Sequence, residues 1–407
     1  MISFPLLSDV SRSCYRAAII PSSLCTQQRQ IEPRQLMRFF DDILRVCHSK
    51  PLIGYNCAMV PAIRQAFRQC IVCLLLSASG IAVAAESGVV LLYHHVATGT
   101  PPSTSISPED FRDHLDYLRD NNFSVMPLDE LVQSLRSRTP LPDRAVAITF
   151  DDGYSSIYET AFPLLQEYGM PFALFVSTEP INNRQKNYMT WEQIRALSEA
   201  GALIANHMVS HPYMLSRNAE ETDANWLARQ RAELLEAEAT ILKETGQSHR
   251  FLAYPYGEFN AQIKAMLVEE GYVGFAQNSG AVGYSSDFHA LPRYPLAGIY
   301  ARLETARVKF STLAFDVELL EPDSPVTELE RPEALLRFNL NGISPSQLGC
   351  YDNGEAMTLT WENRETGLLR IQAADAHSDR RWRYICTAPS TENGRYFWYS
   401  VPWINPR

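Results

Sequence analysis

The sequence predicts an α/β protein: a (β/α) barrel, either closed or distorted and incomplete, followed by a small antiparallel β domain. With roughly 150 residues per domain as a guide, the length of 407 residues suggests two domains, or one large barrel with an appendage. Between residues 89 and 300, short apolar runs alternate with amphipathic segments, which is typical of a parallel sheet covered by helices. No glycine-rich phosphate loop follows any of these strands, which favours a barrel over a doubly wound sheet.

The barrel elements follow in chain order. Residues 89–93 are an apolar strand, and Ser107 and Pro108 begin a helix whose apolar face includes Phe111 and Leu115. Further strands are predicted at residues 123–126, 145–150, 172–176, 202–206, 251–254 and 273–275. Helices are predicted over residues 191–200 and 225–245, and a glycine closes each of them.

After about residue 311 the pattern changes to short runs with polar alternation, which predicts a β-sandwich. The runs are residues 335–340, 357–361, 368–372, 382–386 and 396–401. Their many aromatic side chains are either core or a sugar-stacking face, and core is the commoner role. Cys350 and Cys386, 36 positions apart, predict one disulfide in an exported protein, with two free thiols as the alternative.

The first 85 residues predict processing sequence. From Met59, a basic stretch with Arg64 and Arg68 precedes an apolar run and the small residues around Ala84, which is typical of a secretory signal peptide. A membrane anchor is the alternative, although the apolar run is short and interrupted. We therefore expect an exported protein, periplasmic or secreted, without a membrane span after cleavage. Residues 1–58 would be an upstream extension or the result of a wrongly assigned start.

The net charge of −10 argues against a nucleic-acid partner, because phosphate neutralisation needs clustered Lys and Arg. An acidic body suits neutral or cationic polymers better.

Two neighbouring carboxylates, Asp151 and Asp152, follow the apolar run 145–150 in the motif TFDDG. Neighbouring side chains of a regular strand point to opposite faces of the sheet. Both carboxylates can therefore reach one site only if the turn at Gly153 directs them separately. One carboxylate can then bind a metal while the other accepts a proton from the attacking water. An Asp-Asp-Gly turn by itself is more often structural.

Two histidines lie just after the predicted strand 202–206, in the motif NHMVSHP. His207 and His211 are spaced i, i+4, so their imidazoles project to the same side of a helical turn and can meet one divalent ion. A lone histidine is more often a satisfied polar residue. Together with Asp152 they form a three-ligand set that leaves coordination positions open for water and substrate.

These motifs together resemble the polysaccharide deacetylases of carbohydrate esterase family 4, the nodulation-protein-B homology domain. The resemblance implies that Asp151 is the general base and that Asp152, His207 and His211 bind a divalent metal, for which we expect Zn²⁺, with Co²⁺ and Ni²⁺ as alternatives. Met208 replaces the family's usual Ser or Thr, so a supporting hydrogen bond is lost there. The resemblance covers about residues 89–300. We therefore expect a deacetylase domain at residues 86–310, between the signal peptide at 59–85 and a β-sandwich-like accessory domain at 311–407.

The run AYPYG, at residues 253–257, resembles the family's wall motif, which implies that the backbone N–H of Tyr256 stabilises the oxyanion. Tyr154, Pro255 and Tyr256 are the expected substrate-binding residues. Many members carry an Arg at the position of Ala253, where it holds the catalytic Asp. Arg293, in LPRYP, is our candidate replacement.

The family's general acid is a His in a late Leu-x-His motif, which is missing after Arg293. His94, at the end of the first strand, instead resembles the catalytic His of an order-permuted branch that contains exported poly-N-acetylglucosamine deacetylases. His95 stands where that branch often has Asp.

We therefore expect a metal-dependent hydrolase, acting on C–N bonds other than peptide bonds, that removes N-acetyl groups from an N-acetylglucosamine-containing polymer. An O-acetyl esterase acting on xylan or another glycan is the close alternative. A catalytically silent carbohydrate-binding protein is the alternative from another class. No Gly-x-Ser-x-Gly elbow supports a serine hydrolase.

Overall fold

The computed structural model describes residues 85–391 and 394–407, and these described residues belong to one compact unit. The predicted upstream extension lies outside the described residues, as does the predicted signal peptide except for Ala85. Among the described helices, none combines the length and the apolar character that crossing a bilayer requires.

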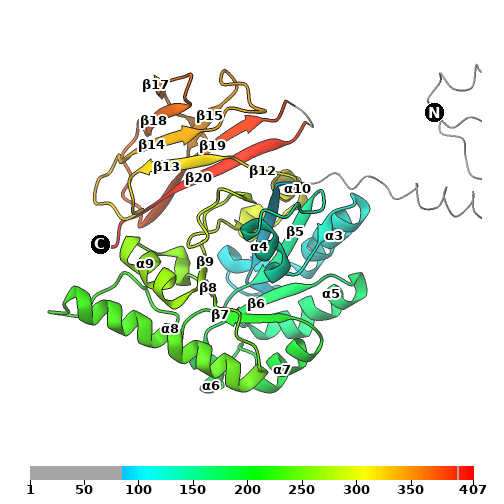
Figure 1. The fold of residues 1–407 in the computed structure, drawn as a ribbon. Helices are drawn as coiled ribbons and strands as arrows, with labels where there is room; N and C mark the ends of the chain where they lie inside the picture. Colours follow the sequence, from blue (N-terminus) through cyan, green and yellow to red (C-terminus); the bar gives the residue numbers. More distant parts are fainter. Residues whose placement is uncertain (1–84, 392–393) are drawn as a thin grey trace, which may run out of the picture. The chain divides into compact units, whose positions relative to one another are not determined.

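A largely parallel sheet forms the centre of the N-terminal half of the described chain (Figure 1). Its main path runs β10-β1-β5-β6-β7-β8-β9, with β4 added beside β5 and β11 beside β1. The strands are β1 (Ser87–Tyr93), β4 (Ser124–Val125), β5 (Ala145–Phe150), β6 (Phe172–Val176), β7 (Leu203–Asn206), β8 (Phe251–Ala253), β9 (Val273–Phe275), β10 (Val282–Gly283) and β11 (Tyr294–Pro295). The predicted order of alternating strands and helices is confirmed.

The sheet is curled, and one short segment connects its two ends. Leu291 forms a parallel bridge with Phe275 of β9, and β11 pairs in parallel with β1. The chain between these two contacts carries Arg293. The predicted barrel is therefore present in a distorted form, in which an irregular segment replaces a full strand.

Helices cover the outside of the curled sheet. They are α3 (Pro108–Asp120), α4 (Leu128–Arg136), α5 (Phe162–Tyr168), α6 (Thr178–Asn182), α7 (Trp191–Glu199), α8 (Asp223–Thr245), α9 (Ala261–Glu270) and α10 (Leu303–Phe310). The side chain of Ser107 caps α3 as expected, and Gly246 ends α8 in the left-handed conformation. In Figure 1, α7 and α8 lie beside β7, and both contact that strand.

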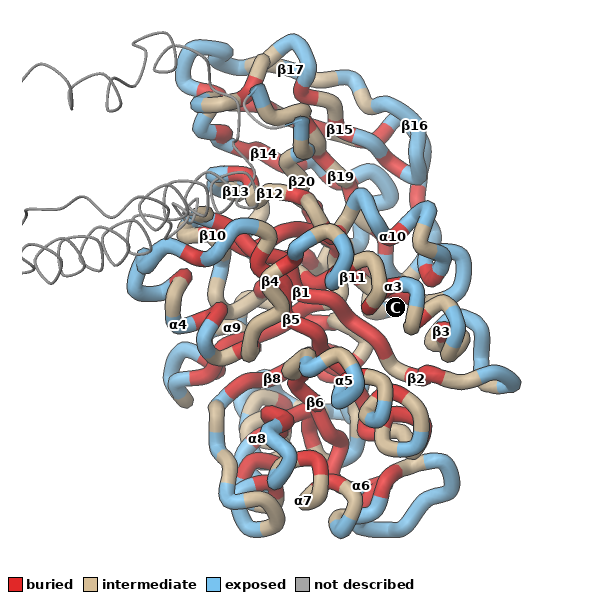
Figure 2. Tube along the Cα trace, turned by 90° about the vertical axis from the view of Figure 1, so that its right-hand side faces the viewer, coloured by how far each residue is buried: buried red, intermediate tan, exposed pale blue. Residues whose placement is uncertain are grey.

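Two apolar clusters lie on the two faces of the sheet because strand side chains alternate. Val89 and Leu91 of β1 belong to one cluster, and Val90 belongs to the other. Figure 2 shows β1, β5 and β6 as buried tube inside a shell of exposed helices and loops. Strands buried on both faces read as continuous apolar runs, which is why they could be predicted from the sequence.

The C-terminal part forms two sheets, of which one is antiparallel and the other antiparallel except for the short β12–β20 pair. One has the order β12-β20-β19-β15-β16 and the other β13-β14-β18-β17. The strands are β12 (Leu313–Ala314), β13 (Val317–Glu321), β14 (Glu333–Phe338), β15 (Gly349–Asp352), β16 (Glu355–Ala356), β17 (Leu359–Asn363), β18 (Leu368–Gln372), β19 (Arg381–Pro389) and β20 (Tyr396–Ile404). A shared core between the sheets includes Trp382, Tyr384 and Trp403, so these aromatic side chains are core.

The predicted disulfide is confirmed. Cys350 of β15 and Cys386 of β19 are directly opposite each other in the ladder and are bonded.

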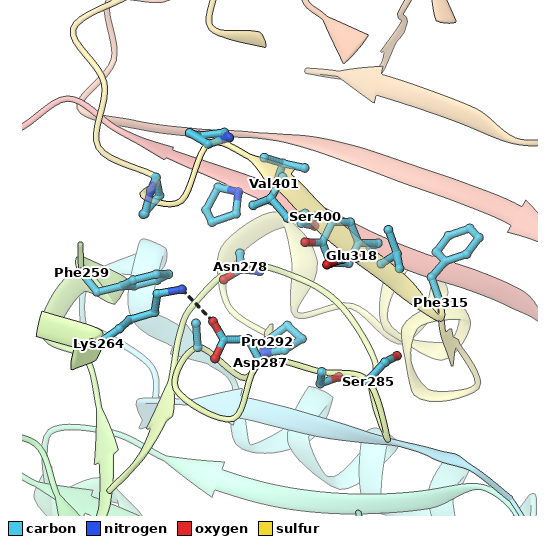
Figure 3. A pocket seen from close by; sticks show the side chains of 18 of the residues that line it. Phe259, Lys264, Asn278, Ser285, Asp287, Pro292, Phe315, Glu318, Ser400 and Val401 are labelled. Carbon is cyan, nitrogen blue, oxygen red and sulfur yellow. Dashed lines mark hydrogen bonds and ion pairs between the residues drawn. The ribbon is translucent and has the colours of Figure 1, made fainter. Parts of the chain in front are cut away.

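A cavity of about 410 Å³ lies between the two parts of the described chain (Figure 3). Phe259, Lys264 and Asp287 line it from the barrel side, while Ser400 and Val401 of β20 line it from the sandwich. Lys264 and Asp287 are ion-paired at 2.8 Å. None of the predicted site residues lines this cavity, so it is separate from the site described next.

Candidate active site

The predicted site residues follow strands that end at one edge of the sheet. His94 follows β1, Asp151 and Asp152 follow β5, and His207 follows β7. The register pairs Tyr93 with Phe150, which brings the ends of β1 and β5 level. The carboxyl ends of parallel strands form one rim, and residues at that rim converge although they are far apart in sequence.

Asp152, His207 and His211 offer three ligand atoms that lie within 4.8 Å of one another. The Nε2 atoms of His207 and His211 are 3.1 and 3.2 Å from the same oxygen, Oδ1 of Asp152. Apart from these ion-pair contacts, this oxygen and Nε2 of His207 are buried and have no hydrogen-bond partner among the described residues. Buried polar atoms are rarely left in that state, so the geometry and the donor set fit a divalent metal ion.

Hydrogen bonds behind the ligands fix their orientation. Nδ1 of His207 is 2.7 Å from the backbone oxygen of Ala253, so Nε2 is the nitrogen left to face the site. The hydroxyl of Ser177 donates to the backbone oxygen of His207 at 2.9 Å. The backbone N–H of Met208 donates to Oδ1 of Asn206, and the N–H of Thr178 donates to the Met208 oxygen. These backbone hydrogen bonds hold the loop at Met208, where the hydroxyl side chain expected from the resemblance is missing.

Asp151 is paired with Arg293 in a fully buried contact. Two guanidinium nitrogens of Arg293 donate to the two carboxylate oxygens of Asp151, each at 2.7 Å. Nη1 of Arg293 also donates to the Thr149 hydroxyl at 3.3 Å. Burial favours a higher pKa for Asp151, but the charge and hydrogen bonds of Arg293, together with the charges of His207 and His94, outweigh it, and the pKa lies below its ordinary value. Asp151 is thus held as a carboxylate in fixed orientation.

His94 is partly exposed at the end of β1 and lies within the electrostatic influence of both aspartates. Burial lowers the pKa of His94, and the charges of Asp152 and Asp151 act in the opposite direction. The neighbouring His95 stacks on the Tyr154 ring with centroids 3.6 Å apart. Tyr154 in turn contacts Tyr188, so an aromatic row borders this side of the site.

Several site residues have left-handed backbone conformations, although none of them is glycine. The φ angles are 74° at Asp152, 67° at Met208, 54° at His211 and 59° at Tyr256. Such angles are uncommon outside glycine and concentrate at functional sites, where the surroundings hold them. Gly153, at φ 91°, completes the turn that separates the two aspartates, and an added Cβ would lie 3.3 Å from Ile181.

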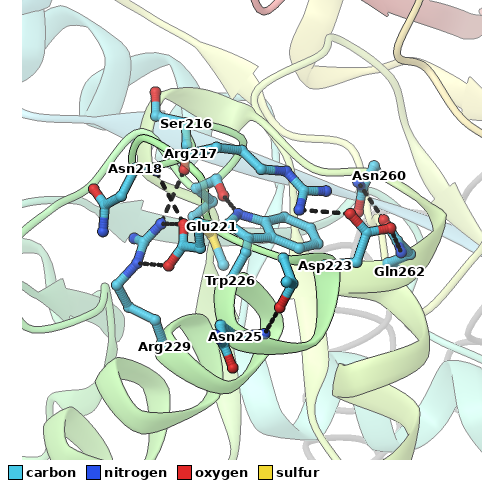
Figure 4. Close-up of polar contacts among 12 residues, drawn as sticks. Ser216, Arg217, Asn218, Glu221, Asp223, Asn225, Trp226, Arg229, Asn260 and Gln262 are labelled. Carbon is cyan, nitrogen blue, oxygen red and sulfur yellow. Dashed lines mark hydrogen bonds and ion pairs between the residues drawn. The ribbon is translucent and has the colours of Figure 1, made fainter.

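The loop after His211 is anchored to α8 by a polar network (Figure 4). Nε1 of Trp226 donates to the backbone oxygen of Met214 at 2.9 Å. Arg217 pairs with Asp223 at 2.7 Å, and Arg229 pairs with Glu221 at 2.7 Å. The loop that carries His211 and Tyr213 is therefore fixed to a rigid helix at several points.

Tyr256 lies next to a metal-ligand candidate. Its ring contacts His211 edge to face, with centroids 4.4 Å apart, and stacks on Tyr213 at 4.0 Å. Pro255 is buried at the start of the same turn, Pro255–Gly257. Tyr213 was not singled out from the sequence, although it lies only two residues after His211. In the structure its side chain is exposed and stacks on Tyr256.

The structure therefore brings together the two aspartates, His94, His207, His211, Tyr256 and Arg293. Sequence reasoning missed Ser177, Asn206 and Thr149, which act through the first set. A partial signal was present in the sequence for two of them, because Thr149 and Asn206 lie at the ends of β5 and β7, just before predicted site residues. Ser177 follows β6, after which no site residue was predicted.

Part of the chain is similar to known proteins. Residues 138–275 match the family model described as polysaccharide deacetylase. A poly-β-1,6-N-acetyl-D-glucosamine N-deacetylase of Staphylococcus epidermidis is 27% identical over 230 residues, which is 51% of this chain and 78% of that protein. The protein of the same name from Escherichia coli is 24% identical, over 47% of this chain, and the chain spans only 34% of its length.

The fold has solved counterparts as well. The deacetylase PplD of Streptococcus pyogenes, solved in complex with acetate, matches with a TM-score of 0.50 and 21% identity, over 55% of this chain and 98% of that one. The matched family model coincides with the strands that carry both aspartates and His207. Residues 138–275, which carry both aspartates and His207, therefore match a polysaccharide deacetylase domain, and the curled sheet has the fold of a solved deacetylase.

Proposed function

We propose that the chain is an exported, metal-dependent deacetylase that hydrolyses N-acetyl groups of an N-acetylglucosamine-containing polymer. The observation that carries the proposal is the meeting of Asp152, His207 and His211 beside the buried pair of Asp151 and Arg293. The names of the Staphylococcus and Escherichia relatives support the choice of polymer. The predicted signal peptide supports export to the periplasm or beyond.

Asp152, His207 and His211 would hold the divalent ion, for which we propose Zn²⁺. A bound ion of this kind supplies Lewis acidity, which polarises the acetyl carbonyl and makes water more acidic. Asp151 accepts the proton of the attacking water, and Arg293 keeps its carboxylate ionised and aimed. The backbone N–H of Tyr256 donates to the developing oxyanion, a contribution of about 3 kcal/mol in comparable sites.

His94 donates a proton to the departing nitrogen, so that the nitrogen leaves as a neutral amine and not as an anion. Removal of the acetyl group then yields acetate and a glucosamine unit. The products are an anion and a cationic polymer, and the cationic polymer is compatible with the net charge of −10.

The decisive experiment combines metal analysis with acetate release from a small glycan panel. The wild-type chain should carry about one divalent ion per chain and release acetate from poly-N-acetylglucosamine or its oligomers, and a chelator should abolish the release. Asp152→Ala should lack both the metal and the activity, because two nitrogen ligands without the carboxylate bind weakly. Preference for acetylxylan would support the esterase alternative, and metal-free wild-type protein without acetate release would overturn the proposal.

A further inference from the structure

The turn that carries the Tyr256 amide is tied to the C-terminal sandwich by a buried carboxylate. Glu258 is fully buried, two residues after Tyr256. Arg380 donates to its two carboxylate oxygens at 2.6 and 2.8 Å, and Arg381 donates to one of them at 2.9 Å. A barrel residue is thus neutralised by two arginines more than 120 positions later in the chain.

The arginines themselves have rigid support. Arg381 is the first residue of β19, the strand that pairs along its length with β20 and carries Cys386 of the disulfide. Arg380 donates from Nη1 to the backbone oxygen of Pro406, and its own backbone oxygen accepts from Asn405. The end of the sandwich therefore presents both guanidinium groups in fixed positions.

The same arginines also approach the two stacked tyrosines beside the metal-ligand candidates. The guanidinium carbon of Arg381 lies 5.5 Å from the Tyr256 ring centre, and that of Arg380 lies 4.8 Å from the Tyr213 ring centre. These are distances at which cations attract aromatic faces. Two ion pairs with Glu258 and one contact with the Tyr256 ring thus hold the turn from the sandwich side, and a second ring contact holds Tyr213, on which Tyr256 stacks.

The turn needs such support because of its backbone. Tyr256 adopts φ 59° and Gly257 adopts φ 72°. A bulky residue keeps a left-handed conformation only where its surroundings hold it. An oxyanion donor is effective only where its N–H points at the place of the developing charge, so the conformation of Tyr256 matters for rate.

We propose that Arg380 and Arg381, acting through Glu258, are positioning residues that set the Tyr256 amide for oxyanion stabilisation. The inference rests on the proposed function and assigns a task to the C-terminal sandwich: it completes the wall of the deacetylase site. The contact differs from the surface ion pair of Arg337 and Glu318, in which both side chains are more than half exposed and little free energy is at stake.

Full-length Glu258→Gln and the double variant Arg380→Ala, Arg381→Ala test this, with Arg337→Ala as the matched control. We expect kcat on N-acetylglucosamine oligomers to fall about 10- to 100-fold in both, as for a displaced catalytic donor, with KM within about threefold and metal content unchanged. The control should behave as wild type. Hydrogen exchange of the peptide over residues 254–259 should become faster in the two test variants only.

Wild-type kcat in a folded double variant overturns the inference, as does a loss of kcat that follows loss of metal. If the double variant does not fold, the single Arg381→Ala, with its side chain 41% exposed, provides the same comparison. If wild type releases no acetate from any glycan while exchange at residues 254–259 still rises in the variants, the proposed function fails and the structural coupling stands.

Discussion

Arg293 places two guanidinium nitrogens 2.7 Å from the two oxygens of Asp151, in a contact from which solvent is excluded on both sides. The two residues are 142 positions apart. The position that holds an arginine in many family members is Ala253 here, and its backbone oxygen instead orients His207. The guanidinium comes from the segment that joins β9 to β1. The same segment therefore serves both the shape of the barrel and the orientation of the proposed base.

Arg293→Lys should lower kcat about 10- to 100-fold without loss of metal. Lysine keeps the charge but replaces a two-pronged donor with a single nitrogen, so Asp151 is no longer fixed in orientation. Steady-state kinetics with metal analysis on the same sample checks this. Wild-type kcat in this variant would mean that the pairing is structural.

Arg293→Met should move the acid limb of the kcat/KM profile to higher pH. Burial raises the pKa of Asp151, and the variant loses both the charge and the hydrogen bonds of Arg293, so that only the charges of His207 and His94 remain to lower it. A base works when deprotonated, so a higher pKa means that activity is lost earlier as the pH falls. The variant should also be less stable by about 3–5 kcal/mol, because the buried carboxylate has lost its partner. An acid limb that coincides with that of wild type would contradict this account.

His94→Gln should impair amide hydrolysis more than ester hydrolysis. An amine needs a proton in order to leave, and general acid catalysis of this kind contributes about 100-fold or more, whereas an activated ester needs little help. Acetate release from N-acetylglucosamine oligomers and from an aryl acetate should be compared at equal metal content. Equal losses on both substrates would assign His94 a role other than that of acid.

Much of this site could be predicted because its residues occupy short motifs directly after buried strands. Asp151, Asp152 and His207 follow apolar runs that are strands at nearly the predicted residues. Parallel strands bring such positions together by topology alone. Arg293 could be proposed only because the expected arginine was missing, which left a buried carboxylate in need of a partner.

The rest could not be predicted, for two physical reasons. Contacts such as Glu258 with Arg380 join distant segments, and no local period in the sequence indicates them. The left-handed angles at Asp152 and Tyr256 contradict the preference of these residue types, because tertiary contacts override local propensity there. Short strands such as β10 and β11 were missed as well, since two residues carry no periodic signal.

Replacing Cys350 and Cys386 by alanine should destabilise the sandwich by about 2–4 kcal/mol. The disulfide closes a segment of 36 positions, which limits the freedom of the unfolded chain. Denaturant unfolding followed by tryptophan fluorescence reports on this part of the chain, because Trp382 and Trp403 lie in the same core. Wild-type protein with reductant should approach the variant. Equal stability of the oxidised and reduced proteins would contradict the prediction.

His114 should make the free energy of unfolding depend on pH between about 4 and 6.5, and the substitution His114→Leu should remove that dependence. It lies on the buried face of α3 with Phe111 and Leu115, and Nδ1 is 3.0 Å from the Tyr93 hydroxyl. Burial lowers the pKa of His114 from 6.5 to about 4. The folded protein therefore keeps this ring neutral at a pH where the unfolded chain protonates it.

The sign of the effect follows from proton uptake. Between pH 6.5 and about 4 the unfolded state binds more protons at this residue than the folded state, so stability falls as the pH falls. Above pH 6.5 the residue contributes no pH dependence, and the total loss across the range is about 3 kcal/mol. In His114→Leu this part of the slope should vanish, although the variant starts from lower stability because the Tyr93 hydroxyl loses its partner. Urea unfolding of both proteins at several pH values measures the difference, and parallel pH curves for the two would show that His114 is protonated as readily in the fold as outside it.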